Sequence, residues 1–310
     1  MRSNRLLLSC VLSPVLALSL HAQARTVAQR LGYPANSKLL ILHADDLAVA
    51  HSVNAASFDA LDRNAVTSAS VMMTCPWVSE VAAYARTHPD ADLGLHLVLT
   101  SEWLTYRWGS VESRDKVPSL LDSAGMMASD TRWVATHASP AEAEREIRAQ
   151  VERALAMGIH PTHLDSHMGS LFSTPELFAA LAKVAHAYHL PFLALKPTGA
   201  LALHPSPLAE SDVVLDAVIS ANAQVPREEW NAFYLQTIAN LKPGLTELIV
   251  HLGHDDAELQ AITVDHADFG SAWRQRDYEV LTSPEFAKAL RDNHVILVKW
   301  KELMRLVNQP

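Results

Sequence analysis

Short apolar runs alternate along this chain with longer segments in which apolar residues recur at helical spacing. The apolar runs predict buried strands at residues 38–43, 68–73, 92–99, 162–164, 192–196, 244–251 and 294–299. Helical spacing, with capping residues or proline at several of the starts, predicts helices at residues 53–64, 77–88, 140–157, 175–189, 228–241 and 283–293. Residues 101–137 look irregular, and residues 197–225 are ambiguous.

This alternation of strands and helices predicts an α/β fold with parallel strands, most simply a barrel. With 310 residues, of which 49% are hydrophobic and 19% charged, the chain can bury a core of that size. No linker or internal repeat interrupts the pattern. We therefore expect one catalytic domain over residues 25–310.

The N-terminus has the form of a secretory signal. Arg2 and Arg5 precede an apolar run at residues 6–20, and Ala22-Gln23-Ala24 has the small-x-small form of a cleavage site. A membrane anchor is the alternative, but 15 apolar residues fall short of the roughly 20 that a spanning helix needs. We expect cleavage after Ala24, no stable membrane insertion afterwards, and export to the periplasm or the medium.

The formal net charge of −9 argues against a nucleic-acid partner, which would favour a basic surface. Sixteen histidines are many for this length, and several lie beside aspartate or glycine. That placement raises the expectation of metal chemistry. The composition does not determine the oligomeric state.

Carboxylates and imidazoles lie at the ends of several predicted strands, where active sites of parallel α/β folds gather. One such group, Asp45-Asp46, favours a bound cation, although a solvated turn with a helix cap also explains it. Between leucines, His96 is either a ligand or a core imidazole. One aspartate and two histidines on separate strand ends leave coordination positions open for water and substrate, which predicts a metal-dependent hydrolase.

Two further patches extend this set. In His163-Leu164-Asp165-Ser166-His167, the last histidine is the better ligand, Asp165 suits a carboxylate that orients an imidazole, and His163 either joins them or only packs. His251 closes another strand, where it either protonates a leaving group, steadies an oxyanion or belongs to a polar loop.

Taken together, these patches resemble the YdjC-like carbohydrate deacetylases, the ChbG/HpnK family. The resemblance covers nearly the whole chain after the signal, and its motifs occur in the family's order. They are LILHADD at 40–46, Asn54, Val66-Thr67-Ser68, GLHLVLT at 94–100, GIHPTHLDSH at 158–167, LIVH at 248–251 and VLTSPEF at 280–286.

The resemblance implies a distorted (β/α) barrel of the polysaccharide-deacetylase and glycoside-hydrolase type. It further implies a divalent metal held by Asp46, His96 and His167, and metal-assisted removal of acetyl groups from N-acetylated sugars or oligosaccharides. Asp45 would be the general base, and His251 the acid that protonates the departing amine. Asp165 would orient a ligating histidine. The ligand types suit Zn²⁺, and an open, hydrated site also suits Mg²⁺.

The chain departs from the family pattern at Ala48, where glycine is usual, at Met168-Gly169, where further histidines are frequent, and at Leu252, where proline is usual. An aromatic-rich segment after the third predicted strand carries Trp103, Tyr106 and Trp108. These rings either stack against a sugar or pack the loop.

Two other classes of function remain open from the residues alone. The first is a different metal-dependent esterase or phosphoesterase on the same scaffold, although no glycine-rich anion loop or arginine cluster is present. The second is a non-catalytic exported sugar-binding protein, which would need neither Asp45 nor His251. An acetylated amino sugar is the expected partner of the deacetylase.

Overall fold

A computed structural model describes residues 25–195, 206–264 and 266–308. The predicted signal at residues 1–24 and the predicted strand end at Lys196 lie outside the described residues. Within them, seven strands form one sheet whose pairings are all parallel. These are β1 (Lys38–Leu47), β2 (Ser68–Val71), β3 (Leu93–Leu97), β4 (Leu164–Ser166), β5 (Ala217–Ser220), β6 (Gly244–Val250) and β7 (Val295–Leu297).

The strand order shows how the sheet curls. Neighbours follow the order β4-β3-β2-β1-β6-β5, and β7 pairs with the first residues of β1. Single bridges continue past both ends, from Leu164 to Phe192 and from Leu195 to Leu215, just before β5. The sheet therefore forms an incomplete barrel whose gap is crossed by isolated bridges. This confirms the predicted α/β fold of the distorted-barrel type.

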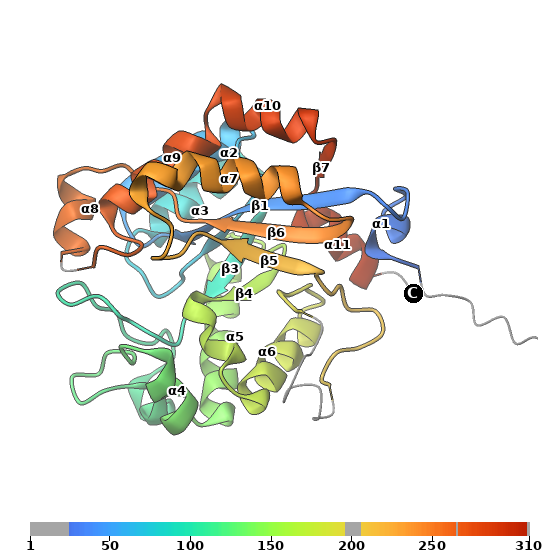
Figure 1. Cartoon of the computed structure of the whole chain (residues 1–310). Helices are drawn as coiled ribbons and strands as arrows, with labels where there is room; N and C mark the ends of the chain where they lie inside the picture. Colours follow the sequence, from blue (N-terminus) through green and yellow to red (C-terminus); the bar gives the residue numbers. More distant parts are fainter. Residues whose placement is uncertain (1–24, 196–205, 265, 309–310) are drawn as a thin grey trace, which may run out of the picture.

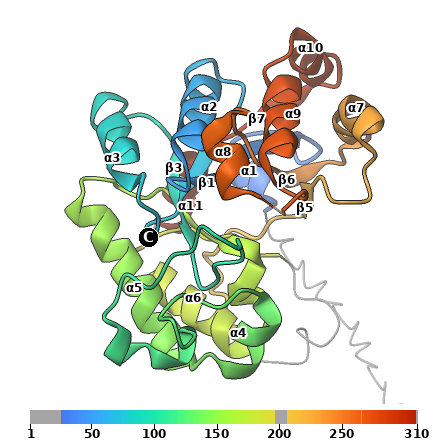
Figure 2. The same cartoon turned by 90° about the vertical axis from the view of Figure 1, so that its left-hand side faces the viewer.

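Helices surround the sheet on its outer side. Figure 2 shows α2, α9 and α7 on one side of the strands and α5 and α6 on the other. The described helices are α1 (Val27–Arg30), α2 (His51–Asp62), α3 (Val78–Thr87), α4 (Thr131–His137), α5 (Pro140–Ala156), α6 (Pro175–Ala187), α7 (Trp230–Asn240), α8 (Ala257–Ile262), α9 (Ser271–Leu281), α10 (Pro284–Asp292) and α11 (Trp300–Val307). None of them is long and apolar enough to cross a membrane.

Alternation along β1 separates the outside of the barrel from its interior. Leu40 and Leu42 belong to the large core that includes the inner faces of α2 and α5. Leu39 and Ile41 face the other way, into a smaller cluster with Trp300 of α11. Figure 1 shows α1 and α11 side by side at this apolar end. Further along the interior face of β1, the side chains become polar.

The structure revises the interpretation of three stretches of the sequence. Residues 101–137 are not wholly irregular, because α4 lies at their end, where the Asp130 carboxylate caps the helix by accepting from the Trp133 N–H. Seven residues are too few to show helical periodicity in the sequence. The ambiguous stretch contains β5, which has only four half-buried residues. The predicted strand at 192–196 has single bridges in place of a regular ladder.

Candidate active site

The interior of the barrel is polar at the C-terminal ends of the strands. Asp45 and Asp46 lie near the end of β1, and His96 lies on β3. His167 directly follows β4 and opens a 3₁₀ turn, His167–Phe172, while His251 directly follows β6. The structure therefore brings the predicted ligands, base and acid to one edge of the sheet.

An irregularity in β1 directs two adjacent carboxylates into the same space. The pairing of β1 with β2 shifts register between Ala44 and Leu47, and Asp46 has a φ of 69°. Side chains of a regular strand alternate between faces, but a bulge with a left-handed residue breaks this alternation. Both carboxylates consequently contact interior imidazoles. Ala48, at a position where the family usually has glycine, also has a positive φ, 79°.

Asp46, His96 and His167 form a three-ligand group. One ligand atom from each lies within 4.8 Å of the others. His96 Nε2 and His167 Nδ1 each lie 3.3 Å from Asp46 Oδ1. That oxygen is buried and has no hydrogen-bond partner among the described residues. A buried, unsatisfied oxygen facing two imidazole nitrogens fits a divalent cation, and the donor set suits Zn²⁺ as well as other divalent ions.

Each of the three ligands is held through its remaining polar atom. His96 Nδ1 lies 2.7 Å from Asp165 Oδ1, and His167 Nε2 lies 3.0 Å from Glu102 Oε2. Arg274 donates from Nη2 to Asp46 Oδ2 at 2.7 Å. Partners of this kind fix the orientation of metal ligands.

Two of these partners were missed by the sequence analysis. Glu102 follows the Gly-x-His-x-x-Leu-Thr motif by two residues, and this proximity was the only signal available for it. Arg274 lies on α9, which the sequence did not predict, 228 positions after Asp46. Nothing in the local pattern points to that pair.

Charged neighbours shift the pKa values of the three ligands. Burial raises the pKa of Asp46, but Arg274 and His167 outweigh it and hold that pKa well below its usual range. Burial lowers the pKa of His167, but Glu102 and Asp46 together raise it to about 10. Glu102 and Asp46 thus favour the protonated imidazole, and a metal ion would compete with a proton for His167 Nδ1.

His251 lies near one oxygen of the Asp45 carboxylate and His43 near the other. The His251 Nε2 is 3.9 Å from Asp45 Oδ2, and its ring packs edge-on against Phe269 with centroids 4.8 Å apart. The His251 backbone N–H donates to Asp277 Oδ2 at 3.0 Å, which anchors the end of β6 to α9. Burial lowers the pKa of His251 to about 4, so the imidazole is neutral near pH 7.

His163 lies deeper in the barrel than the three ligands. Its ring stacks on Trp300 with centroids 4.9 Å apart and leaves no room for a side chain at Gly94. His163 can be grouped with His43 and Asp165 as a further set of ligand-type atoms. Asp165, however, is already engaged by His96 and His43, each within 3.0 Å of one of its oxygens. His163 therefore packs below the site.

The aromatic residues of the loop after β3 form a wall beside the ligands. Trp103 and Trp108 are 2% and 4% exposed, so neither offers an open face for a sugar to stack on. Trp108 lies 6.0 Å from the His167 ring, and the Arg274 guanidinium lies 5.7 Å from the Trp103 ring. Tyr106 is partly buried and donates to the Val49 carbonyl at 2.8 Å. Of the two predicted roles, loop packing fits both tryptophans.

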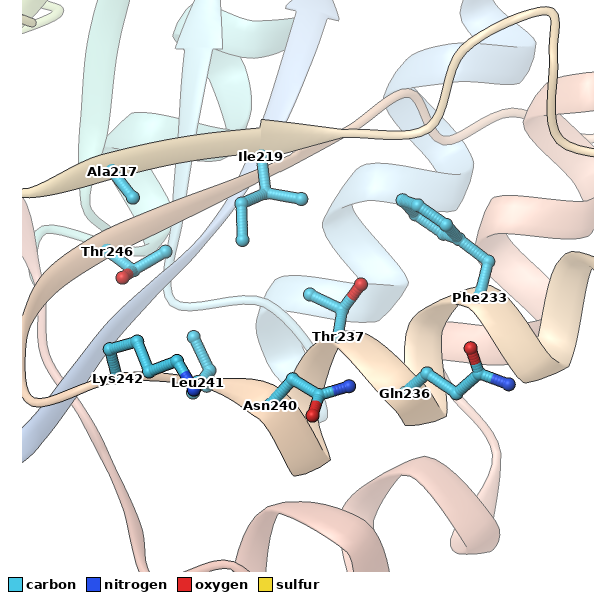
Figure 3. A pocket seen from close by; sticks show the side chains of 9 residues that line it. All are labelled: Ala217, Ile219, Phe233, Gln236, Thr237, Asn240, Leu241, Lys242 and Thr246. Atoms are coloured by element: carbon cyan, nitrogen blue, oxygen red, sulfur yellow. The ribbon is translucent and has the colours of Figure 1, made fainter.

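A separate hollow of about 370 Å³ lies between β5, β6 and α7 (Figure 3). Ile219, Phe233 and Thr237 are among the side chains that line it. Its lining contains no carboxylate and no imidazole. This hollow therefore lacks groups for metal or acid–base chemistry, and the edge with Asp46 is the better candidate.

The chain is similar to several known proteins. The family model described as YdjC-like protein matches residues 39–292. A carbohydrate deacetylase of Thermus thermophilus is 33% identical over 272 residues, which cover 86% of this chain and 94% of that protein. A chitooligosaccharide deacetylase of Yersinia enterocolitica is 28% identical over 160 residues, 50% of this chain and 58% of that protein. A crystal structure from Enterococcus faecalis, titled a putative cellobiose-phosphate cleavage protein, has a TM-score of 0.73 at 24% identity. It covers 86% of this chain and 99% of that one.

Proposed function

The chain belongs to the YdjC-like protein family, and from this membership and the geometry of its site we propose that it is a metal-dependent hydrolase that removes acetyl groups from N-acetylated sugars or oligosaccharides. The observation that carries the proposal is the convergence of Asp46 Oδ1 with nitrogens of His96 and His167. The relatives named as carbohydrate deacetylases support the class of substrate.

Two further residues supply the proton transfers. A divalent cation at the three ligands would polarise the amide carbonyl and lower the pKa of a bound water. Asp45, adjacent to the ligand Asp46, accepts the proton of the attacking water. His251, 3.9 Å from Asp45, gives a proton to the departing amine. Because its pKa of about 4 leaves His251 neutral near pH 7, it must gain that proton during turnover, and Asp45, once it has taken the proton of the water, is the donor.

The test is acetate release from a panel of N-acetylated sugars by the purified protein, with and without a chelator and added Zn²⁺ or Mg²⁺. We expect release that the chelator abolishes, and none from Asp46→Ala. Asp115→Asn, which changes an exposed carboxylate on the loop after β3, should keep full activity. No acetate from any sugar, while the wild-type protein binds metal, would refute the deacetylase function.

We also infer that the protein is exported and that residues 1–24 are its cleaved signal. The support is the basic start, the 15-residue apolar run and the Ala22-Gln23-Ala24 site. N-terminal sequencing of protein from the periplasm or the medium should give Arg25 as the first residue. Full-length protein in the cytosol would contradict this inference.

A further inference from the structure

One layer below the three ligands, the barrel interior holds a second polar group centred on His43. This imidazole is fully buried on the interior face of β1. Its Nε2 lies 3.0 Å from Asp45 Oδ1, 3.0 Å from Asp165 Oδ2 and 3.0 Å from the Ser70 hydroxyl. One nitrogen therefore contacts two carboxylates that come from different strands.

Each of these two carboxylates has a second oxygen, which faces a residue of the candidate active site. Asp165 Oδ1 lies 2.7 Å from Nδ1 of the proposed ligand His96. Asp45 Oδ2 faces His251 Nε2 at 3.9 Å. His43 thus connects the proposed base to the carboxylate that orients a metal ligand.

The surroundings of His43 favour its charged form. Burial lowers the pKa of His43, but hydrogen bonds to Asp165 and Asp45 and the charge of Glu247 outweigh it and raise that pKa well above its usual value. Glu247 Oε1 lies 3.7 Å from His43 Nδ1 and accepts from Trp300 Nε1 at 2.8 Å. An imidazolium there has an N–H on each nitrogen, and Nε2–H donates to Asp165 Oδ2 while it forms an ion pair with Asp45 Oδ1. Asp45 Oδ1 also accepts from the Ser70 hydroxyl at 3.2 Å, and this hydroxyl lies 3.0 Å from the same Nε2.

We propose that His43 is a positioning residue, whose Nε2 donates to Asp165 and lies 3.0 Å from Asp45, and which so fixes the base relative to the His96 ligand. The catalytic part of this proposal rests on the proposed function. The metal-binding part does not, because the orientation of His96 governs metal affinity whatever the reaction is.

The test compares two substitutions with a control. His43→Leu removes the donor, while His43→Gln keeps a side-chain amide with two N–H groups near the position of Nε2. Ile41→Ala removes a buried side chain two residues earlier on the same face of β1, within the smaller apolar cluster. Each variant is measured for kcat and KM of acetate release, and for Zn²⁺ affinity by competition with a chromogenic chelator.

For His43→Leu we expect kcat to fall about 100-fold with KM unchanged, because a misplaced base slows the chemical step. We expect its Zn²⁺ affinity to fall about 10-fold, the low end for the loss of a partner that orients a ligand. His43→Gln should stay within about 10-fold of wild type in kcat, and Ile41→Ala should keep both values.

Wild-type kcat in His43→Leu, or a His43→Gln that is no better than His43→Leu, would overturn the proposal. If His43→Leu does not fold, His43→Asn replaces it, because the shorter amide cannot reach both carboxylates and should rank below His43→Gln. If the wild-type protein releases no acetate, the deacetylase function fails, and the Zn²⁺ affinities alone test the role of His43. Equal Zn²⁺ affinities of the wild type and His43→Leu would then overturn the proposal.

Discussion

Replacement of Gly94 by alanine tests how tightly the interior below the site is packed. A Cβ added at Gly94 would lie 2.5 Å from His163 Nδ1 and still closer to Cε1 and Nε2 of that ring. Atoms in van der Waals contact are normally about 3.5 Å apart or more, so the ring must move by roughly 1 Å. The surrounding rings leave no space for this movement, because the centroid of the stacked Trp300 ring lies 4.9 Å away and that of the edge-on His43 ring lies 5.0 Å away.

The cost follows from this lack of space. Overpacking of a well-packed core typically destabilises a protein by about 1–3 kcal/mol. We expect the upper end, about 3 kcal/mol, because the obstructing atoms belong to a ring wedged between Trp300 and His43 rather than to the far end of a flexible chain. At about 2–4 °C per kcal/mol for a domain of this size, Gly94→Ala should lower Tm by about 6–12 °C. Urea and thermal denaturation measure both quantities.

The double variant Gly94→Ala with His163→Ala isolates the clash. Removing the ring removes its conflict with Cβ, so Gly94→Ala should cost much less in the His163→Ala background than alone. We expect a coupling energy of about 1–3 kcal/mol between the two positions. Additive costs, or a Gly94→Ala variant within about 0.5 kcal/mol of wild type, would refute the reasoning.

Three further outcomes are expected. Glu102→Gln, which weakens the partner of His167 Nε2, should lower Zn²⁺ affinity about 10–100-fold in a competition titration, with Asp115→Asn as the unaffected control; equal affinities would contradict the role of Glu102. Burial raises the pKa of Glu247 from 4.5 to about 7, so the folded state binds more protons than the unfolded state in that window, and the free energy of unfolding falls as pH rises through it. Glu247→Gln should reduce this dependence of the free energy of unfolding on pH, measured by urea titrations at pH 5 and pH 7.5. An unchanged dependence would contradict the raised pKa of Glu247. Ala48→Gly should raise the free energy of unfolding by about 1 kcal/mol, because relief of a positive φ outweighs the added chain entropy, and a loss of stability would contradict the strain.

The parts of the site that lie at strand ends could be predicted from the sequence. Asp46, His96 and His167 each follow or end an apolar run, and parallel strands bring such ends to one edge. The register of β3 with β4 then sets His96 directly beside Asp165. This pairing could not be read from the sequence, because the expectation that Asp165 orients a histidine rested on its closeness to His163 and His167 within one segment.

The contribution of α9 could not be predicted, for a physical reason. Its buried face carries Arg274 and Asp277, which are 1% exposed and whose partners come from other elements. Asp277 accepts from Trp230 and Tyr234 of α7 and from a backbone N–H after β6. A helix with charges on its inner face shows no apolar stripe, so periodicity does not reveal it.

The loop aromatics show a second limit of sequence patterns. Trp103 and Trp108 follow the strand that carries His96, where an aromatic residue suits either a sugar platform or a wall. The choice depends on exposure, which local sequence does not encode, because the neighbours that bury these rings include Arg274 and His167 from distant segments. Because both rings are buried beside the ligands, the loop excludes water from that side of the site. Ion pairs are stronger where water is excluded.

The charges of the assembled interior explain why this edge of the barrel suits a divalent ion. Carboxylates gather there, because Asp45, Asp46, Glu102 and Asp165 all lie within ion-pair distance of its imidazoles. Arg274 contacts Asp46 alone among them. The carboxylates raise the pKa values of His43, His96 and His167 in spite of burial, which indicates an excess of negative charge around these rings. Buried charge is costly unless it is compensated, and a divalent cation compensates more of it than a monovalent ion does. The same negative charge extends to the layer below, where Glu247 Oε1 lies 3.7 Å from His43 Nδ1, so the imidazole of His43 lies between carboxylates on both of its nitrogens.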